Sequence, residues 1–371
     1  MPFAIPARRL RLAASFQAAS PPPARGADRL TIRELQFTDL REPSSGRRYA
    51  IVRLQTTSGI TGYGECPAVS RDDFWRRREP LEIPATSIET LSRALSGRPG
   101  LNAAVNMAAL DIAARYANVP LYQYLGGPTR AKVRVMAALP SLTAARPAGF
   151  SAFLVPVPAK DARQQLDALR AETGPNIDFV VDASAASLPP REAAQLCRDM
   201  ETFHPYWIDE PCAASNILAA RRLASESVAP LGFGRTLASA AAFEDLMREE
   251  AIDVLRPSLA VHSLTAIRKL SAMAETRYAA VAPYHEGGPV ATAAAAIVMP
   301  SMTRYGNDSI PNFFIQQVPV AEAASDREMR AAIGGAGLEA PKDGFLELPK
   351  GPGLGVNPDF EALKRFTEAA R

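Results

Sequence analysis

The feature that most constrains the fold is a repeat of about 25 residues within residues 131–335. Short apolar segments alternate there with stretches whose apolar residues have helical spacing. Polar residues at the ends of successive apolar segments follow one another at intervals of 23 to 27 residues: Asp182, Asp209, Arg235, Ser258 and Tyr284. Parallel strands need a long crossover, usually a helix, so this repeat predicts parallel βα units.

Eight apolar segments are the candidate strands of this repeat: 133–139, 151–157, 177–182, 205–210, 230–234, 251–257, 278–283 and 312–317. Eight βα units of this length predict a (β/α)₈ barrel. The alternative, an open doubly wound sheet, is disfavoured because no glycine-rich phosphate loop follows a candidate strand.

The segments on either side of the repeat indicate a second domain. Alternating patterns predict an antiparallel meander and helical spacing predicts two helices, over residues 30–40, 48–59, 87–97 and 101–119. We therefore assign residues 30–130 to an α+β domain and residues 131–335 to the barrel. Residues 336–371 are expected to form a hairpin and a short helix that return to the α+β domain.

Residues 1–29 are rich in Ala, Pro and Arg and are interpreted as a disordered or targeting tail. The Arg8–Arg9 pair precedes a short apolar stretch, which is weakly similar to a twin-arginine export signal. We therefore expect a cytoplasmic protein, with export as the alternative.

The composition narrows the function classes. It is 47% hydrophobic and 22% charged, which is typical of a globular protein with a large core. The net charge of +3 is too weak to indicate nucleic-acid binding, and no apolar run is long enough to span a membrane. The cysteines Cys66, Cys197 and Cys212 show no CxxC pattern and are expected to be buried thiols.

Six segments together resemble the enolase superfamily, in its mandelate racemase and muconate lactonizing enzyme branch. They follow the family order along residues 30–360: "VRLQTTSGITGYGEC", "AAVNMAALDIAARYANVPLYQYLGG", "FVVDASAA", "YWIDEP", "APYHEGGPVATAAAA" and "DGFLELPKGPGLGV". The resemblance implies a modified (β/α)₈ TIM-type barrel whose C-terminal face is closed by an N-terminal α+β capping domain.

The resemblance also implies a chemistry. In active members, three acids at successive strand ends hold Mg²⁺, and the metal binds the substrate carboxylate. Bases on neighbouring strands remove the α-proton while the metal stabilises the enediolate. The products are racemised, cycloisomerised or dehydrated acids.

The metal-ligand positions differ from this pattern at one critical place. Asp182 and Asp209 match the first two ligands, although the family usually has Glu at the second. Arg235 stands at the third position, where the family has Glu. A cation about 5 Å from Mg²⁺ costs roughly 6–7 kcal/mol at an effective dielectric constant of 20. We therefore expect no cofactor, or Mg²⁺ only if a remnant site still binds it. Neighbouring Glu210 is expected to face the opposite side of its strand.

The acid–base positions differ as well. Barrel positions that hold lysines or acids in many family members are here Leu154, Pro156, Ser258 and Gln317. Tyr284 stands where the family has a histidine, and a one-residue bulge would bring His285 into the site. Tyr284 and His285 are thus the remaining candidates for proton transfer.

These departures lead to a hypothesis about Arg235. Its guanidinium is expected to replace the metal and to pair with both Asp182 and Asp209. Simpler interpretations stay open: the two acids cap helices, Arg235 is a solvated loop charge, and Tyr284 and His285 are packing residues. The charged run at residues 76–78 is expected to be a solvated face, or else to meet an anionic ligand.

Three functions remain at this point. The preferred one is a superfamily member that has lost Mg²⁺-dependent α-proton abstraction. The alternatives are an active racemase, cycloisomerase or dehydratase with a rearranged site, and a structural or interaction protein. The expected partners are a small carboxylate ligand and further copies of the chain in a homo-oligomer, with no nucleic acid and no membrane. The sequence names no substrate.

Overall fold

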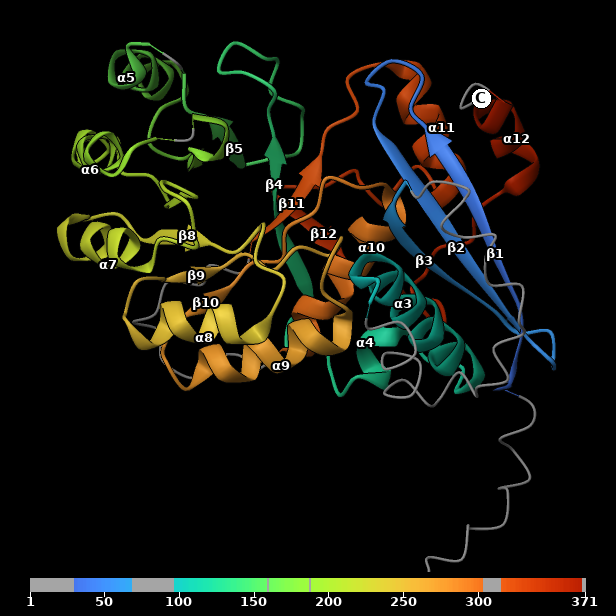
Figure 1. The fold of residues 1–371 in the computed structure, drawn as a ribbon. Coiled ribbons are helices and arrows are strands. Elements are labelled where there is room, and N and C mark those ends of the chain that lie inside the picture. Colours follow the sequence, from blue (N-terminus) through green and yellow to red (C-terminus); the bar gives the residue numbers. More distant parts are fainter. Residues whose placement is uncertain (1–29, 69–96, 159, 187, 303–314, 369–371) are drawn as a thin grey trace, which may run out of the picture.

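A computed structural model describes residues 30–68, 97–158, 160–186, 188–302 and 315–368. The structure consists of an N-terminal three-stranded sheet and a sheet built mainly of parallel strands. In Figure 1 the N-terminal sheet lies on one side of the molecule and the helices α5, α6 and α7 line the opposite side. In the described part of the chain, no helix is long and apolar enough to cross a membrane.

The N-terminal sheet is the predicted antiparallel meander. Its strands are β1 (Ile32–Arg41), β2 (Arg48–Thr56) and β3 (Thr61–Pro67), and the helices α3 (Pro99–Tyr116) and α4 (Leu121–Tyr124) follow. Helix α3 packs directly on β3: a Cβ atom on Gly64 would lie 1.9 Å from the carbonyl oxygen of Ala104. Glycine is therefore required there. The expected helix at 87–97 and the charged run at 76–78 lie outside the described residues, except for Gly97.

All eight predicted strands of the repeat are present in the described chain. They are β4 (Lys132–Ala138), β5 (Ala152–Pro156), β6 (Asp178–Asp182), β7 (Trp207–Asp209), β8 (Leu231–Phe233), β9 (Val254–Leu255), β10 (Ala280–Val281) and β11 (Ile315–Pro319). Their paired order is β11-β4-β5-β6-β7-β8-β9-β10, and every neighbouring pair is parallel. This is the predicted modified (β/α)₈ barrel.

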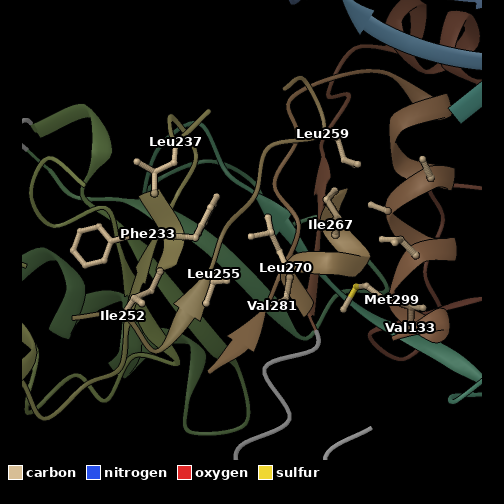
Figure 2. Packing of buried hydrophobic residues seen from close by; sticks show 14 of the residues in the cluster. Val133, Phe233, Leu237, Ile252, Leu255, Leu259, Ile267, Leu270, Val281 and Met299 are labelled. Atoms are coloured by element: carbon tan, nitrogen blue, oxygen red, sulfur yellow. The ribbon is translucent and has the colours of Figure 1, made fainter. Parts of the chain in front are cut away.

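Seven helices connect or follow these strands in the described chain: α5 (Ala162–Thr173), α6 (Pro190–Asp199), α7 (Ile217–Glu226), α8 (Ala240–Arg248), α9 (Leu264–Glu275), α10 (Pro289–Val298) and α11 (Ala324–Gly334). Figure 2 shows how one side of the sheet is covered: Leu255 of β9 and Val281 of β10 lie near Ile267 and Leu270 of α9. These four side chains are buried in one continuous apolar core, which holds the barrel helices on the strands.

The C-terminal segment contacts both domains. An antiparallel bridge joins Lys342 to Phe345, and strand β12 (Phe345–Glu347) then pairs antiparallel with β4, so this part of the segment joins the barrel sheet. Helix α12 (Phe360–Glu368) packs on β1. Arg115 of α3 donates to the Val356 carbonyl at 2.7 Å, and Asp111 accepts from the Leu354 amide at 2.8 Å. These contacts tie the segment to the capping domain.

Candidate functional site

The carboxyl ends of β6, β7 and β8 bring Asp182, Asp209 and Arg235 together. Arg235 Nη1 donates to Asp182 Oδ2 at 2.7 Å, and Arg235 Nε donates to Asp209 Oδ2 at 3.0 Å. Nη2 of the same guanidinium donates to Asp209 as well. The Arg235 side chain is 7% exposed and that of Asp209 is fully buried. Arg235 therefore points inward and pairs with both acids, as expected, and is no solvated loop charge.

A second arginine, which the sequence analysis missed, completes this cluster. Arg256 follows β9 and is fully buried. Its Nε donates to Asp209 Oδ2 at 3.0 Å, and its Nη1 donates to the Ala282 carbonyl at 2.7 Å. Its guanidinium carbon lies 5.3 Å from the ring centre of Trp207. The sequence feature that could have identified Arg256 is its place after the apolar run at residues 251–255, near a strand end like Arg235.

The ring of Tyr284 covers this ion-pair cluster. The guanidinium carbon of Arg235 lies 4.5 Å from the ring centre of Tyr284, and that of Arg256 lies 5.6 Å from it. The Tyr284 hydroxyl donates to a carboxylate oxygen of Glu286. A cation over an aromatic face is attracted by the ring quadrupole, so the ring both screens and stabilises the arginines.

The charges in the cluster balance. Asp182 and Asp209 supply two negative charges, and Arg235 and Arg256 supply two positive charges. Burial alone would raise the pKa of Asp209, but attraction to both arginines outweighs it and lowers that pKa. Burial likewise opposes the charge on Arg235, but its two acids raise its pKa above the usual value. Asp209 and Arg235 are therefore both ionised near neutral pH.

Glu210 holds the backbone segment that carries Arg235. It does not join the two aspartates, in agreement with the prediction that it faces away. One oxygen of its carboxylate accepts from the backbone amides of Gly234 and Arg235, at 2.7 and 2.8 Å. Glu210 itself has a left-handed backbone with φ of 50°. It thus fixes the backbone from which Arg235 reaches the two aspartates.

These residues do not fit the three-carboxylate magnesium site implied by the family. The guanidinium of Arg235 occupies the space between Asp182 and Asp209. In the described chain, no group of three His, Cys, Asp or Glu residues could hold a metal ion. Divalent hard cations prefer several oxygen ligands and are repelled by a neighbouring arginine.

A cavity lies beside the cluster, between the capping domain and the barrel. Its volume is about 790 Å³, within the range of small-molecule sites. The barrel lines it with Ser258, Tyr284 and His285, and the capping domain lines it with Tyr49 and Glu65. The ends of the parallel strands and the capping sheet thus enclose one chamber.

Glu65 is the second residue that sequence analysis missed. It lies on β3, is 3% exposed, and accepts from the Gly288 amide at 2.5 Å and the Ala291 amide at 3.3 Å. Burial raises the pKa of Glu65 to about 7, although these hydrogen bonds and Arg330 oppose the shift. In the sequence, Glu65 is simply the acid in "GYGEC", and nothing there indicates which barrel loop it contacts.

The structure separates the predicted site residues into two groups. Ser258, Tyr284 and His285 line the cavity. Leu154, Pro156 and Arg235 do not line it, which corrects the prediction that they are pocket residues. Leu154 packs inside the barrel with Trp207 and Val254, and Arg235 lies under the Tyr284 ring. The side chain of Gln317 lies outside the described part of the chain.

Comparison with known proteins establishes the family. A family model described as "Enolase C-terminal domain-like" matches residues 125–363. The chain belongs to the enolase superfamily. The match confirms the resemblance to the mandelate racemase and muconate lactonizing enzyme branch. The solved structure of a Mandelate racemase/muconate lactonizing enzyme-like protein from Roseovarius sp. TM1035 shares the fold, with a TM-score of 0.75 and 22% identity. The similarity covers 91% of this chain and 95% of that chain.

Relatives of this superfamily member are named as sugar-acid enzymes. A D-galactonate dehydratase from Xanthomonas euvesicatoria is 26% identical, with 90% of this chain and 95% of the relative covered. A D-gluconate dehydratase from Thermoproteus tenax is 25% identical, over 91% of this chain and 74% of the relative. The solved 3,6-anhydro-D-galactonate cycloisomerase from Zobellia galactanivorans shares the fold with a TM-score of 0.78 at 21% identity, over 91% of this chain and 99% of that chain.

Proposed function

We propose that this protein is a dehydratase or cycloisomerase of a sugar acid, working through a rearranged site in the cavity between the capping domain and the barrel. The observation that carries the proposal is a chamber of about 790 Å³ at the carboxyl ends of the strands, with the buried carboxyl of Glu65 in its wall. Relatives that match nine-tenths of the chain are named as dehydratases of sugar acids, which supports this substrate class.

The chemistry requires a base that removes the proton next to the substrate carboxylate. A base works best when its pKa lies near the working pH, and burial raises the pKa of Glu65 to about 7. In a dehydration, Glu65 takes the α-proton, the bond from the β-carbon to its hydroxyl breaks, and the hydroxyl leaves as water after receiving a proton. Tyr284 is the candidate donor for that second proton, because it lines the same chamber and its phenol hydroxyl carries a proton at neutral pH.

The experiment is deuterium exchange at carbon 2 of D-galactonate, D-gluconate and D-xylonate, followed by proton NMR in D₂O. The purified protein is assayed in EDTA and again with Mg²⁺, alongside Glu65→Gln. We expect exchange or a dehydrated product in EDTA, and loss of both in the variant. Exchange that requires Mg²⁺, or that survives in Glu65→Gln, contradicts the rearranged site.

The second candidate function is sugar-acid binding without turnover. The arginine between Asp182 and Asp209 favours it, because that ion pair occupies the position of the family's metal. Binding of a sugar acid with no exchange at carbon 2 would support this candidate. The third possibility, a structural or interaction protein, is disfavoured by the open chamber, which such a role does not require.

A further inference from the structure

A sugar acid in this chamber needs a cation for its carboxylate, and most nearby cations are already paired. Arg235 and Arg256 are neutralised by the two aspartates at the strand ends. Arg47 of the capping domain binds the buried carboxylate of Glu42 at 2.9 Å. Arg330 of α11 binds Glu42 as well and forms a two-point contact with Glu339. Each of these arginines therefore already has at least one carboxylate partner.

Arg48 is different. It is the first residue of β2, it is exposed, and it lines the chamber. Among the described residues its side chain has no hydrogen bond, ion pair or ring contact. In the β1–β2 register it stands directly opposite Arg41, which also has no such contact within the described ranges. Like charges opposite one another on a sheet are destabilising, so this pair leaves a positive charge without internal compensation.

The backbone that carries Arg48 is held in place. In the turn before it, the Gly46 amide donates to the Glu42 carbonyl. The carboxylate of Asp326 on α11 accepts from the amides of Ser44 and Ser45 at 2.7 and 2.9 Å. Asp326 is 1% exposed. These contacts fasten the turn to the barrel, so the backbone from which Arg48 reaches the chamber is held in place before a ligand binds.

The acids that line the chamber are mostly engaged elsewhere. Asp326 binds the two turn amides, Glu286 accepts from the Tyr284 hydroxyl, and Glu65 accepts from two backbone amides of the α10 end. Glu322 lines the chamber with no side-chain partner in the described part of the chain. Arg48 is thus a cation in the chamber lining that has no carboxylate partner among the described residues, and it stands opposite Arg41 in the sheet.

We propose that Arg48 binds the carboxylate of the sugar acid, in place of the metal that holds it in the family. This inference rests on the proposed function and names the anchoring residue of that site. The substrate carboxylate is then held from the capping domain, while the Glu65 carboxyl on the adjacent strand lines the same chamber. Arginine suits this role because its planar guanidinium can donate two parallel hydrogen bonds to one carboxylate.

The test is calorimetric binding of D-galactonate, D-gluconate and D-xylonate to the whole chain, with the uncharged alcohol D-galactitol as a comparison ligand. The variants are Arg48→Gln and Arg48→Lys, with Arg33→Gln as the matched control, since Arg33 is exposed on the same sheet and does not line the chamber. We expect Arg48→Gln to weaken binding of the acids about 10-fold to 100-fold. Binding of D-galactitol should not change, and Arg33→Gln should match the unaltered chain.

The outcomes separate the two proposals. If the unaltered chain binds a sugar acid and Arg48→Gln binds it equally well, the role of Arg48 is wrong and the proposed function stands. If the unaltered chain binds none of the three acids, the proposed function is wrong and Arg48 has no carboxylate to hold. Arg48→Lys should retain part of the affinity, because charge remains while the two-point geometry is lost. Equal thermal unfolding of all variants shows that each one is folded.

Discussion

Replacing Arg235 by Glu tests whether the arginine is what keeps a metal out of this site. The cluster of Asp182, Asp209, Arg235 and Arg256 has no net charge. In Arg235→Glu, three carboxylates would face Arg256 alone, which leaves a net charge of about −2. The variant therefore has both the oxygen ligands and the charge that Mg²⁺ prefers.

The cost of this change follows from the burial of the pair. Removing one partner of a buried ion pair typically lowers the free energy of unfolding by about 3–5 kcal/mol. A carboxylate about 4–5 Å from each aspartate adds about 3–4 kcal/mol of repulsion per pair at an effective dielectric constant of 20. Protonation of one carboxyl relieves part of that repulsion. Mg²⁺ at 100 times its dissociation constant then raises the free energy of unfolding by about 2.7 kcal/mol.

The assay is urea unfolding of the unaltered chain, Arg235→Glu and Arg235→Met, each in EDTA and in MgCl₂. We expect both variants to be less stable than the unaltered chain in EDTA, and only Arg235→Glu to regain stability with Mg²⁺. Arg235→Met controls for the loss of the cation without a new ligand. The reasoning is refuted if the unaltered chain binds Mg²⁺ at micromolar concentration, or if MgCl₂ does not raise the free energy of unfolding of Arg235→Glu.

Two further predictions concern buried carboxyls. The pKa of Glu65 rises from 4.5 to about 7 on folding, so the folded chain keeps a proton that the unfolded chain loses. The free energy of unfolding should therefore fall by about 3 kcal/mol as the pH rises from about 4.5 to 7. In urea unfolding, Glu65→Gln should lack this dependence on pH. An unchanged slope would contradict it. Asp209→Asn leaves Arg256 without a carboxylate and should cost about 3–5 kcal/mol, whereas Asp178→Asn, which breaks a half-exposed pair, should cost less than about 1 kcal/mol. Because the arginines lower the pKa of Asp209, its contribution to the free energy of unfolding is present above a pH of about 4 and is lost in stronger acid. Similar losses of stability in Asp209→Asn and Asp178→Asn would argue against a buried cluster.

The barrel could be predicted from the sequence because its signal is local. Each strand carries its own apolar run, and each crossover carries its own helical spacing, so eight strands were found along with the meander at the N-terminus. The C-terminal segment was harder. Strand β12 pairs with β4, whose residues lie about 200 positions earlier, and its own sequence does not distinguish this partner from a hairpin.

The candidate site could be predicted only in part. The resemblance to the enolase superfamily grouped Asp182, Asp209 and Arg235, because they stand at its three metal-ligand positions. Arg256 was missed because it directly follows a two-residue strand, and Glu65 was missed because it comes from the other domain. Whether Tyr284 or His285 faces the chamber was left open, and both line it.

The sequence by itself determined the repeat of strands and helices, the capping sheet and the presence of a cation where an acid was expected, since periodicity and residue type are properties of neighbouring positions. Only the tertiary structure decided that Arg235 is buried between two aspartates, that Tyr284 covers it and that the chamber lies beside it. The physical reason is that burial and ionic pairing depend on side chains more than 20 positions apart in the chain. Their contacts, and hence their pKa values, exist only once the strand ends and the capping domain come together.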